Sequence, residues 1–148
     1  MEKAKRRLPL VPSDPIAEPV PERPRWQWIF GAAGALLLAW LVLAAGVTAL
    51  GDALGVNAGA GALLVALHAL ALGLAGLGAG SLVGRFGGAA NGREAGLGGA
   101  LAALIACVLA AISAPELGVS TWALAFVVTA LLGSACGYAG ARLALRKR

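Results

Sequence analysis

Few residues in this chain have side chains suited to chemistry, and the single histidine, His68, is the first of them. A histidine inside an apolar stretch can relay protons or bind a metal or haem, so it is a functional candidate. One histidine supplies too few ligands for a metal site built from protein alone. No charged residue stands well inside any apolar stretch to couple with it. We expect a neutral histidine hydrogen-bonded to a neighbouring helix, with a functional role as the alternative.

The other candidates are two cysteines, Cys107 and Cys136, and two acidic residues, Asp52 and Glu116. The cysteines fall in different apolar stretches, at depths that differ by about 7 Å if both stretches are helical. That offset argues against a disulfide, and we expect both to pack as small apolar side chains. The sequence contains no paired carboxylates, nucleophilic triad or metal-ligand cluster. We therefore predict that the protein is not an enzyme and carries no metal or cofactor.

The segment RFGGAANGRE, from Arg85 to Glu94, has the glycine content of a phosphate-binding loop. It lacks the Gly-Lys-Ser/Thr ending and the preceding strand that make such a loop specific. We interpret it as a turn between helices in which Arg85 and Arg93 contact anionic lipid headgroups. The net charge of +5 does not indicate nucleic-acid binding, because the basic residues flank apolar stretches. Membrane topology and anionic lipid explain that placement.

The candidate residues lie in or beside four long stretches of uncharged residues, which must position them. The chain is 59% apolar and 13% charged, whereas soluble domains average about 45–50% and about 25%. Each stretch exceeds the roughly 20 residues that a helix needs to cross the hydrocarbon core. The sequence therefore predicts an all-α membrane protein with four transmembrane helices in an up-down bundle. The expected spans are residues 28–50, 61–83, 96–113 and 121–142.

The basic residues predict the orientation of these spans. All twelve lie before the first span, between the second and third, or at the end of the fourth. They are Lys3, Lys5, Arg6, Arg7, Arg23, Arg25, Arg85, Arg93, Arg142, Arg146, Lys147 and Arg148. The positive-inside rule then places both termini in the cytoplasm. Trp26, Trp28 and Trp122 stand at span ends, where indole rings favour the membrane interface.

Residues 1–25 form a separate region before the four-helix domain of residues 26–148. The region is rich in proline, which lacks a backbone donor and favours extended polyproline II. We therefore predict a disordered cytoplasmic tail. It is not a typical signal peptide, because its charged, proline-broken region is too long. Residues 6–12, RRLPLVP, have the shape of ligands for polyproline-binding domains.

Two glycine ladders are the strongest local pattern in the sequence. Their members, at a constant offset of 57 residues, are Gly76, Gly80 and Gly84 in the second span, and Gly133, Gly137 and Ala141 in the fourth. Residues four apart share a helix face, and in lipid close backbone packing helps to hold helices together. We predict that both ladders are helix-packing faces, within one bundle or between subunits. The offset also indicates two duplicated helical hairpins, with chance similarity as the alternative.

Three motifs between Gly80 and Leu143 extend this glycine pattern. They are GSLVGR at 80–85, GREAGLGGA at 92–100 and GSACG at 133–137. With these motifs, the stretch resembles a group of small, glycine-rich, four-span bacterial membrane proteins of unknown function. The resemblance implies a four-helix bundle in a bacterial plasma membrane, and it implies no activity.

Three functions fit these patterns. The first is a non-catalytic scaffold, assembly factor or small subunit that packs by its glycine faces, in a homo-oligomer or a larger membrane complex. The second is a minimal oligomeric transporter or channel for a small solute, and the third is an anchor whose tail recruits a cytoplasmic protein. A water-filled cavity that gathers His68, Thr129, Ser134 and Thr48 would favour transport. A dry, close-packed interior would favour the first function.

Overall fold

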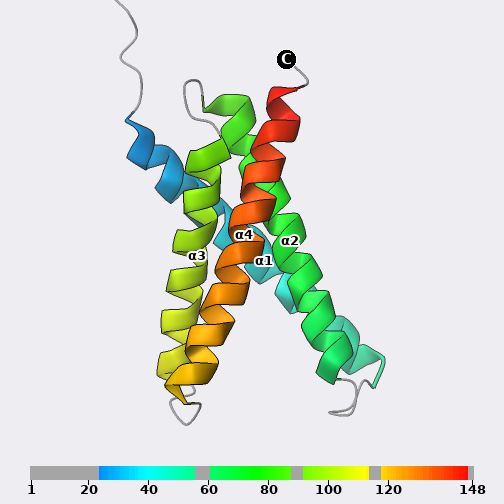
Figure 1. Cartoon of the computed structure of the whole chain (residues 1–148). Coiled ribbons are helices and arrows are strands. Elements are labelled where there is room, and N and C mark those ends of the chain that lie inside the picture. The colour runs from blue at the N-terminus through cyan, green and yellow to red at the C-terminus, as the bar shows by residue number, and fades with distance from the viewer. Residues whose placement is uncertain (1–23, 56–60, 88–91, 114–117, 147–148) are drawn as a thin grey trace, which may run out of the picture.

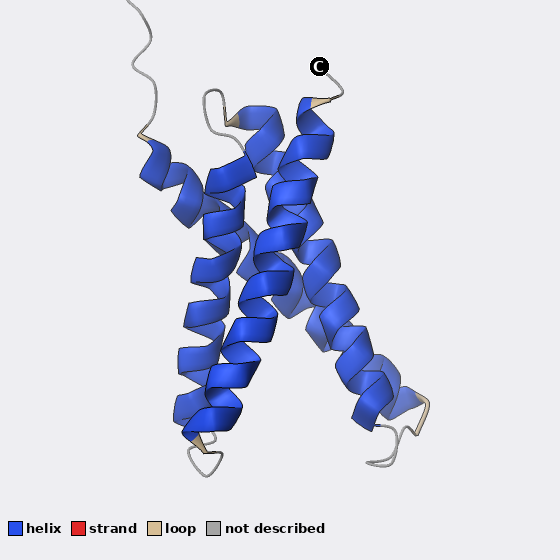
Figure 2. Cartoon of the chain, viewed as in Figure 1, coloured by secondary structure: helices blue, strands red, loops and turns tan. Residues whose placement is uncertain are grey.

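The computed structural model describes residues 24–55, 61–87, 92–113 and 118–146. These residues form four helices, α1 (Arg25–Ala53), α2 (Gly61–Phe86), α3 (Gly92–Ser113) and α4 (Val119–Leu145). Figure 2 shows only helices and short loops in this part of the chain. All four helices are long and apolar enough to cross a membrane, which confirms the predicted all-α fold. The predicted disordered tail, Glu116, Lys147 and Arg148 lie outside the described residues.

The helices extend beyond the predicted spans. The 29 residues of α1 correspond to about 43 Å at 1.5 Å per residue, close to the thickness of a bilayer with its headgroups. Asp52 therefore lies in α1, and Arg93 and Glu94 lie in α3, although we had placed them in connections. The sequence predicted spans that were too short because only the part of a helix inside the hydrocarbon must be uncharged.

The helices run alternately between two ends of the bundle. Figure 1 shows the start of α1, the end of α4 and the α2–α3 connection at the same end. We call it the basic end, because it carries every described Lys or Arg residue: Arg25, Arg85, Arg93, Arg142 and Arg146. Asp52 and Trp122 lie toward the other, which we call the opposite end.

Each helix packs mainly against two others. α4 packs against α2 and α3, and α1 packs against the same two helices. α2 and α3 share much less contact, although they follow one another in the chain. Around the bundle the order is therefore α1, α2, α4, α3, and the neighbours α2 and α4 run parallel to each other.

Small side chains make up the core of the bundle. The buried apolar residues other than glycine are Ala32, Ala33, Leu36, Ala71, Ala75, Ala79, Val83, Ala95, Ala102, Ala103 and Ala141. Many large apolar residues, such as Leu38, Val42 and Leu131, are exposed instead. A soluble protein would bury such residues, whereas lipid solvates them and leaves close approach of small residues to hold helices together.

The bundle is not equally compact along its length. Figure 1 shows α2 and α4 crossing toward the basic end and diverging toward the opposite end, where α3 stays beside α4 and α1 lies near α2. Both glycine ladders lie in the basic-end half of their helices. The two halves of the molecule therefore present different candidate sites.

Candidate functional site

The ladder on α2 faces the backbone of α4. A methyl group added at Gly80 would overlap the carbonyl of Gly137, and one added at Gly84 would lie 2.5 Å from the carbonyl oxygen of Ala141. At Gly76 the added carbon would lie 3.0 Å from Cβ of Cys136. These separations leave no room for a side chain at Gly80 or Gly84, so the two helices touch backbone to backbone at these positions.

The ladder on α4 faces a different neighbour. A carbon added at Gly137 would lie 2.8 Å from the carbonyl oxygen of Ala95, and one at Gly133 would lie 3.2 Å from that of Gly99, both on α3. Gly140, outside the ladder, faces α2 instead, against the carbonyl of Leu77. The packing therefore does not repeat between the two hairpins, and their duplication stays a hypothesis from the sequence.

Helix α3 carries a glycine face that we did not predict as a packing surface. A carbon added at Gly99 would lie 2.5 Å from the carbonyl of Gly133 on α4. Gly98 lies outside this face, because a carbon added there would lie 2.5 Å from Cβ of Ala32 on α1. Gly92 lies against the ring of Tyr138. The spacing of glycines at positions 92, 96 and 99 carried this signal, because such positions share a helix face.

His68 forms its hydrogen bond within its own helix. Its Nδ1 lies 2.8 Å from the carbonyl oxygen of Leu64, one turn earlier. Since a carbonyl only accepts, Nδ1 donates, and in a neutral ring Nε2 is left as an acceptor. The predicted hydrogen bond to a neighbouring helix was therefore wrong. A residue four positions earlier on the same helix is already within reach, so no second helix is needed.

His68 lines a cleft of about 430 Å³, which we call the histidine cleft. Its lining residues are Trp40, Leu64, Val65, His68, Ala69, Leu72, Val128, Thr129 and Leu132. The hydroxyl of Thr129 donates to the carbonyl oxygen of Ala125 at 2.7 Å, so this group too is satisfied by its own helix. The cleft gathers His68 and Thr129, but Ser134 and Thr48 do not line it. It is a mostly apolar cleft whose lining includes the polar side chains of His68 and Thr129.

A void of about 30 Å³ between all four helices shares Trp40, Leu72 and Thr129 with this cleft. The indole Nε1 of Trp40 is buried and has no hydrogen-bond partner within the described residues. A buried N–H without a partner costs free energy and calls for an explanation. Apart from Trp40 and Thr129, the void is lined by aliphatic residues and glycine, and a cavity with so few polar groups is not expected to hold a water.

Both cysteine thiols are free, as we predicted. Cys136 packs against Gly76 of α2. The Sγ atom of Cys107 lies 3.8 Å from the Thr129 hydroxyl oxygen, which places this thiol beside the histidine cleft. Among the described residues, no group of three or more His, Cys, Asp or Glu side chains could hold a metal ion.

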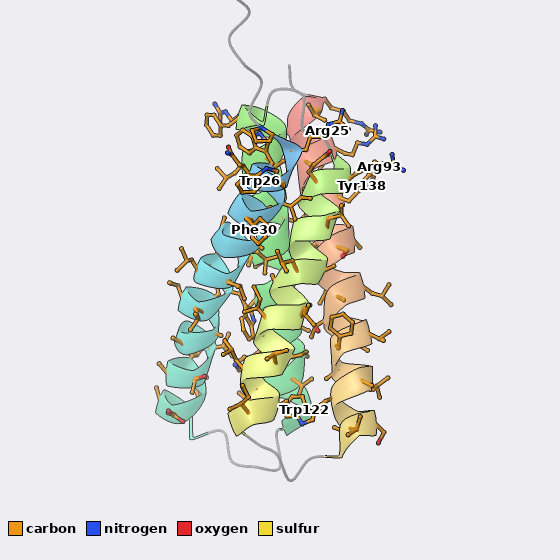
Figure 3. The ribbon with its side chains drawn as sticks, turned by 90° about the vertical axis from the view of Figure 1, so that its left-hand side faces the viewer. Arg25, Trp26, Phe30, Arg93, Trp122 and Tyr138 are labelled. Carbon is orange, nitrogen blue, oxygen red and sulfur yellow. The ribbon has the colours of Figure 1, made fainter. Side chains whose placement is uncertain are left out.

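The basic end holds a buried carboxylate that we had not predicted. Glu94 is only 6% exposed and lies in the first turn of α3, where a negative charge is favoured by the helix dipole. Nearby on α4, Arg142 Nε donates to the Tyr138 hydroxyl at 2.9 Å, and its guanidinium lies 5.2 Å from the centroid of that ring. Figure 3 shows Tyr138 and Trp26 at this end and Trp122 at the other, as interfacial aromatic residues are placed in membrane proteins.

No family model, curated protein or solved structure matches this chain. The resemblance to small, glycine-rich, four-span bacterial membrane proteins therefore stands on its sequence motifs alone. What the chain does has to be inferred from its own geometry.

Proposed function

We propose that this protein is a non-catalytic integral membrane subunit that acts as a packing or assembly element for other membrane helices. In this proposal its basic end faces the cytoplasm of a bacterial cell, since cytoplasmic flanks of membrane proteins carry the excess of Lys and Arg. The partner is a second copy of the chain or another membrane protein.

The close backbone packing of the basic-end half is the observation that supports this role. Adding even one carbon at Gly80 or Gly99 would overlap or crowd the backbone of α4, so this half has no space for a solute path through the chain. The polar side chains near midmembrane, His68 and Thr129, are bonded to carbonyls of their own helices. The glycine faces are used within the bundle, so in this proposal a partner packs against the exposed apolar residues on its outside.

Site-specific photo-crosslinking in native membranes tests this proposal. A photoreactive residue replaces one exposed residue of each helix in turn: Val42, Leu70, Val108 and Leu131. We expect a protein adduct of one discrete mass from one or two of these positions, and lipid adducts from the others. Lipid adducts alone from all four positions would contradict an assembly role. An adduct of twice the chain mass would identify the partner as a second copy.

A transporter or channel is the second candidate, because His68 and Thr129 lie on the same cleft. Proteoliposomes that contain the full chain and a pH-sensitive dye would report proton flux. Flux that is present with the native chain and lost with His68→Gln would favour this function over assembly. Equal dye response in empty and loaded vesicles would exclude a proton pathway.

The anchor function depends on the tail before residue 24, which lies outside the described residues. It stays a prediction from the sequence. Deletion of residues 1–25 should remove cytoplasmic proteins from a pull-down if the tail recruits them, and an unchanged set of partners would end that hypothesis.

A further inference from the structure

A groove of about 750 Å³ lies between α2 and α4 at the basic end, and we call it the basic-end groove. Its lining residues are Leu77, Ser81, Leu82, Arg85, Phe86, Gly140, Leu143 and Ala144. It is larger than the histidine cleft and lies in the other half of the bundle. No function described so far makes use of it.

The polarity of the groove changes along its length. Arg85 lies in the last turn of α2, at the basic end. Leu77 and Gly140 line the groove at a deeper level, and Leu77 precedes Arg85 by about 12 Å along the helix axis. Leu82 and Leu143 line the groove between these levels. Arg85 at the basic end is thus continuous with the apolar part of the groove, which runs along the outside of the α2–α4 pair.

Arg85 is the cationic side chain of this groove. Its guanidinium lies 5.9 Å from the centroid of the Phe86 ring, a contact that holds a cation by the ring quadrupole. Its five N–H donors match the oxygens of a phosphate group. The Ser81 hydroxyl already donates to the carbonyl oxygen of Gly78 at 2.7 Å, so the proton donors for an anion in the groove come from Arg85.

We propose that the basic-end groove binds an anionic phospholipid from the adjacent leaflet. The lipid phosphate lies on Arg85, and one acyl chain follows Leu82 and Leu143 down to Leu77 and Gly140. Charge complementarity selects this occupant, since the described Lys and Arg residues all lie at this end and basic pockets between helices bind anionic headgroups. The apolar floor favours a lipid over a soluble phosphate. This proposal does not depend on the assembly role.

Native mass spectrometry of the full chain, titrated with phosphatidylglycerol or with phosphatidylcholine of the same acyl chains, tests the proposal. We expect phosphatidylglycerol to bind about fivefold more tightly, the factor that one arginine near a membrane surface supplies. Arg85→Gln should abolish this preference, and Arg85→Lys should keep part of it. Arg25→Gln is the matched control, because it removes the same charge at the same end without altering the groove.

Two further measurements distinguish binding of the acyl chain from binding of the phosphate group. Ser81→Leu should weaken both lipids while it preserves the preference, because it fills the apolar part of the groove. Glycerol 3-phosphate, the soluble headgroup, should fail to displace phosphatidylglycerol. Equal binding of the two lipids, or equal losses with Arg85→Gln and Arg25→Gln, would overturn the proposal. Displacement by glycerol 3-phosphate would reduce the groove to a phosphate site and would also overturn it.

Discussion

The two halves of the α2–α4 pair form opposite kinds of interface. At the basic end, the backbones of the two helices touch at Gly80 and Gly137. Toward the opposite end, the same helices diverge (Figure 1), and the histidine cleft lies between Val65 and Val128. Because one continuous pair of helices makes both interfaces, the difference arises from the residues at the contact and not from the fold.

Side-chain size explains the difference. Glycine at every fourth position lets two helix axes approach until backbone atoms meet, which leucine and valine at the facing positions prevent. Two straight helices in contact at one end must then separate toward the other. The glycine ladders therefore determine the close-packed half directly, and they open the cleft indirectly.

Replacing the glycine at the closest contact should have the largest effect on this contrast. Gly80→Ala places a carbon into the carbonyl of Gly137, and we expect a loss of about 3 kcal/mol of unfolding free energy, as for strong overpacking. Gly78→Ala is the control two residues away, because nothing lies within 4 Å of a carbon added there. Thermal unfolding of both variants in detergent measures the contrast. Equal melting temperatures would show that α2 and α4 are not in backbone contact.

Enlarging an alanine should distinguish the core from the cleft. Ala75 is 2% exposed, so Ala75→Leu should cost about 2 kcal/mol by overpacking. Ala69 is exposed and lines the histidine cleft, so Ala69→Leu should change stability by less than about 0.5 kcal/mol. Denaturant unfolding in mixed micelles compares the two. A larger loss at Ala69 than at Ala75 would mean that the cleft is closed.

Removing the buried carboxylate of Glu94 tests how much its charge stabilises the basic-end half. Glu94→Ala should lower stability by about 1 kcal/mol, because it removes a first-turn acid from the positive end of the α3 dipole. Asp52→Ala removes an exposed carboxylate from the last turn of α1, the negative end of its dipole, and should leave the melting temperature unchanged or raise it slightly. A lower melting temperature for Asp52→Ala than for Glu94→Ala would show that the buried position of Glu94 does not stabilise the protein.

The smallest effect belongs to the histidine. Its hydrogen bond to Leu64 stays within one helix turn, so His68→Gln should keep expression, folding and phenotype close to those of the native chain. The expected change in stability is below about 0.5 kcal/mol. Growth of a strain that depends on the protein, compared at equal expression, measures this. Loss of function with normal expression would show that His68 is a functional residue and that the histidine cleft is a functional site.

Hydropathy and charge sufficed to predict the four helices, because long uncharged blocks have few alternatives in a bilayer. The lateral order of the helices could not be predicted, since it depends on which glycine face meets which neighbour. Gly137 faces α3 and Gly140 faces α2, and nothing in their spacing distinguishes the two. The burial of Glu94 was missed for a related reason. A charged residue next to a glycine-rich segment predicts a loop, although Glu94 lies in the first turn of α3.

The position of α4 has a consequence for synthesis of the protein. Both the α2 ladder and the α3 glycine face pack against this helix, and it leaves the ribosome after the other three helices, since chains are made from the N-terminus. The first three helices therefore enter the bilayer before the helix that covers these glycine faces. A chain that stops before α4 would leave these glycine faces without their partner helix, and we expect membrane quality-control proteases to degrade it faster than a chain that includes α4.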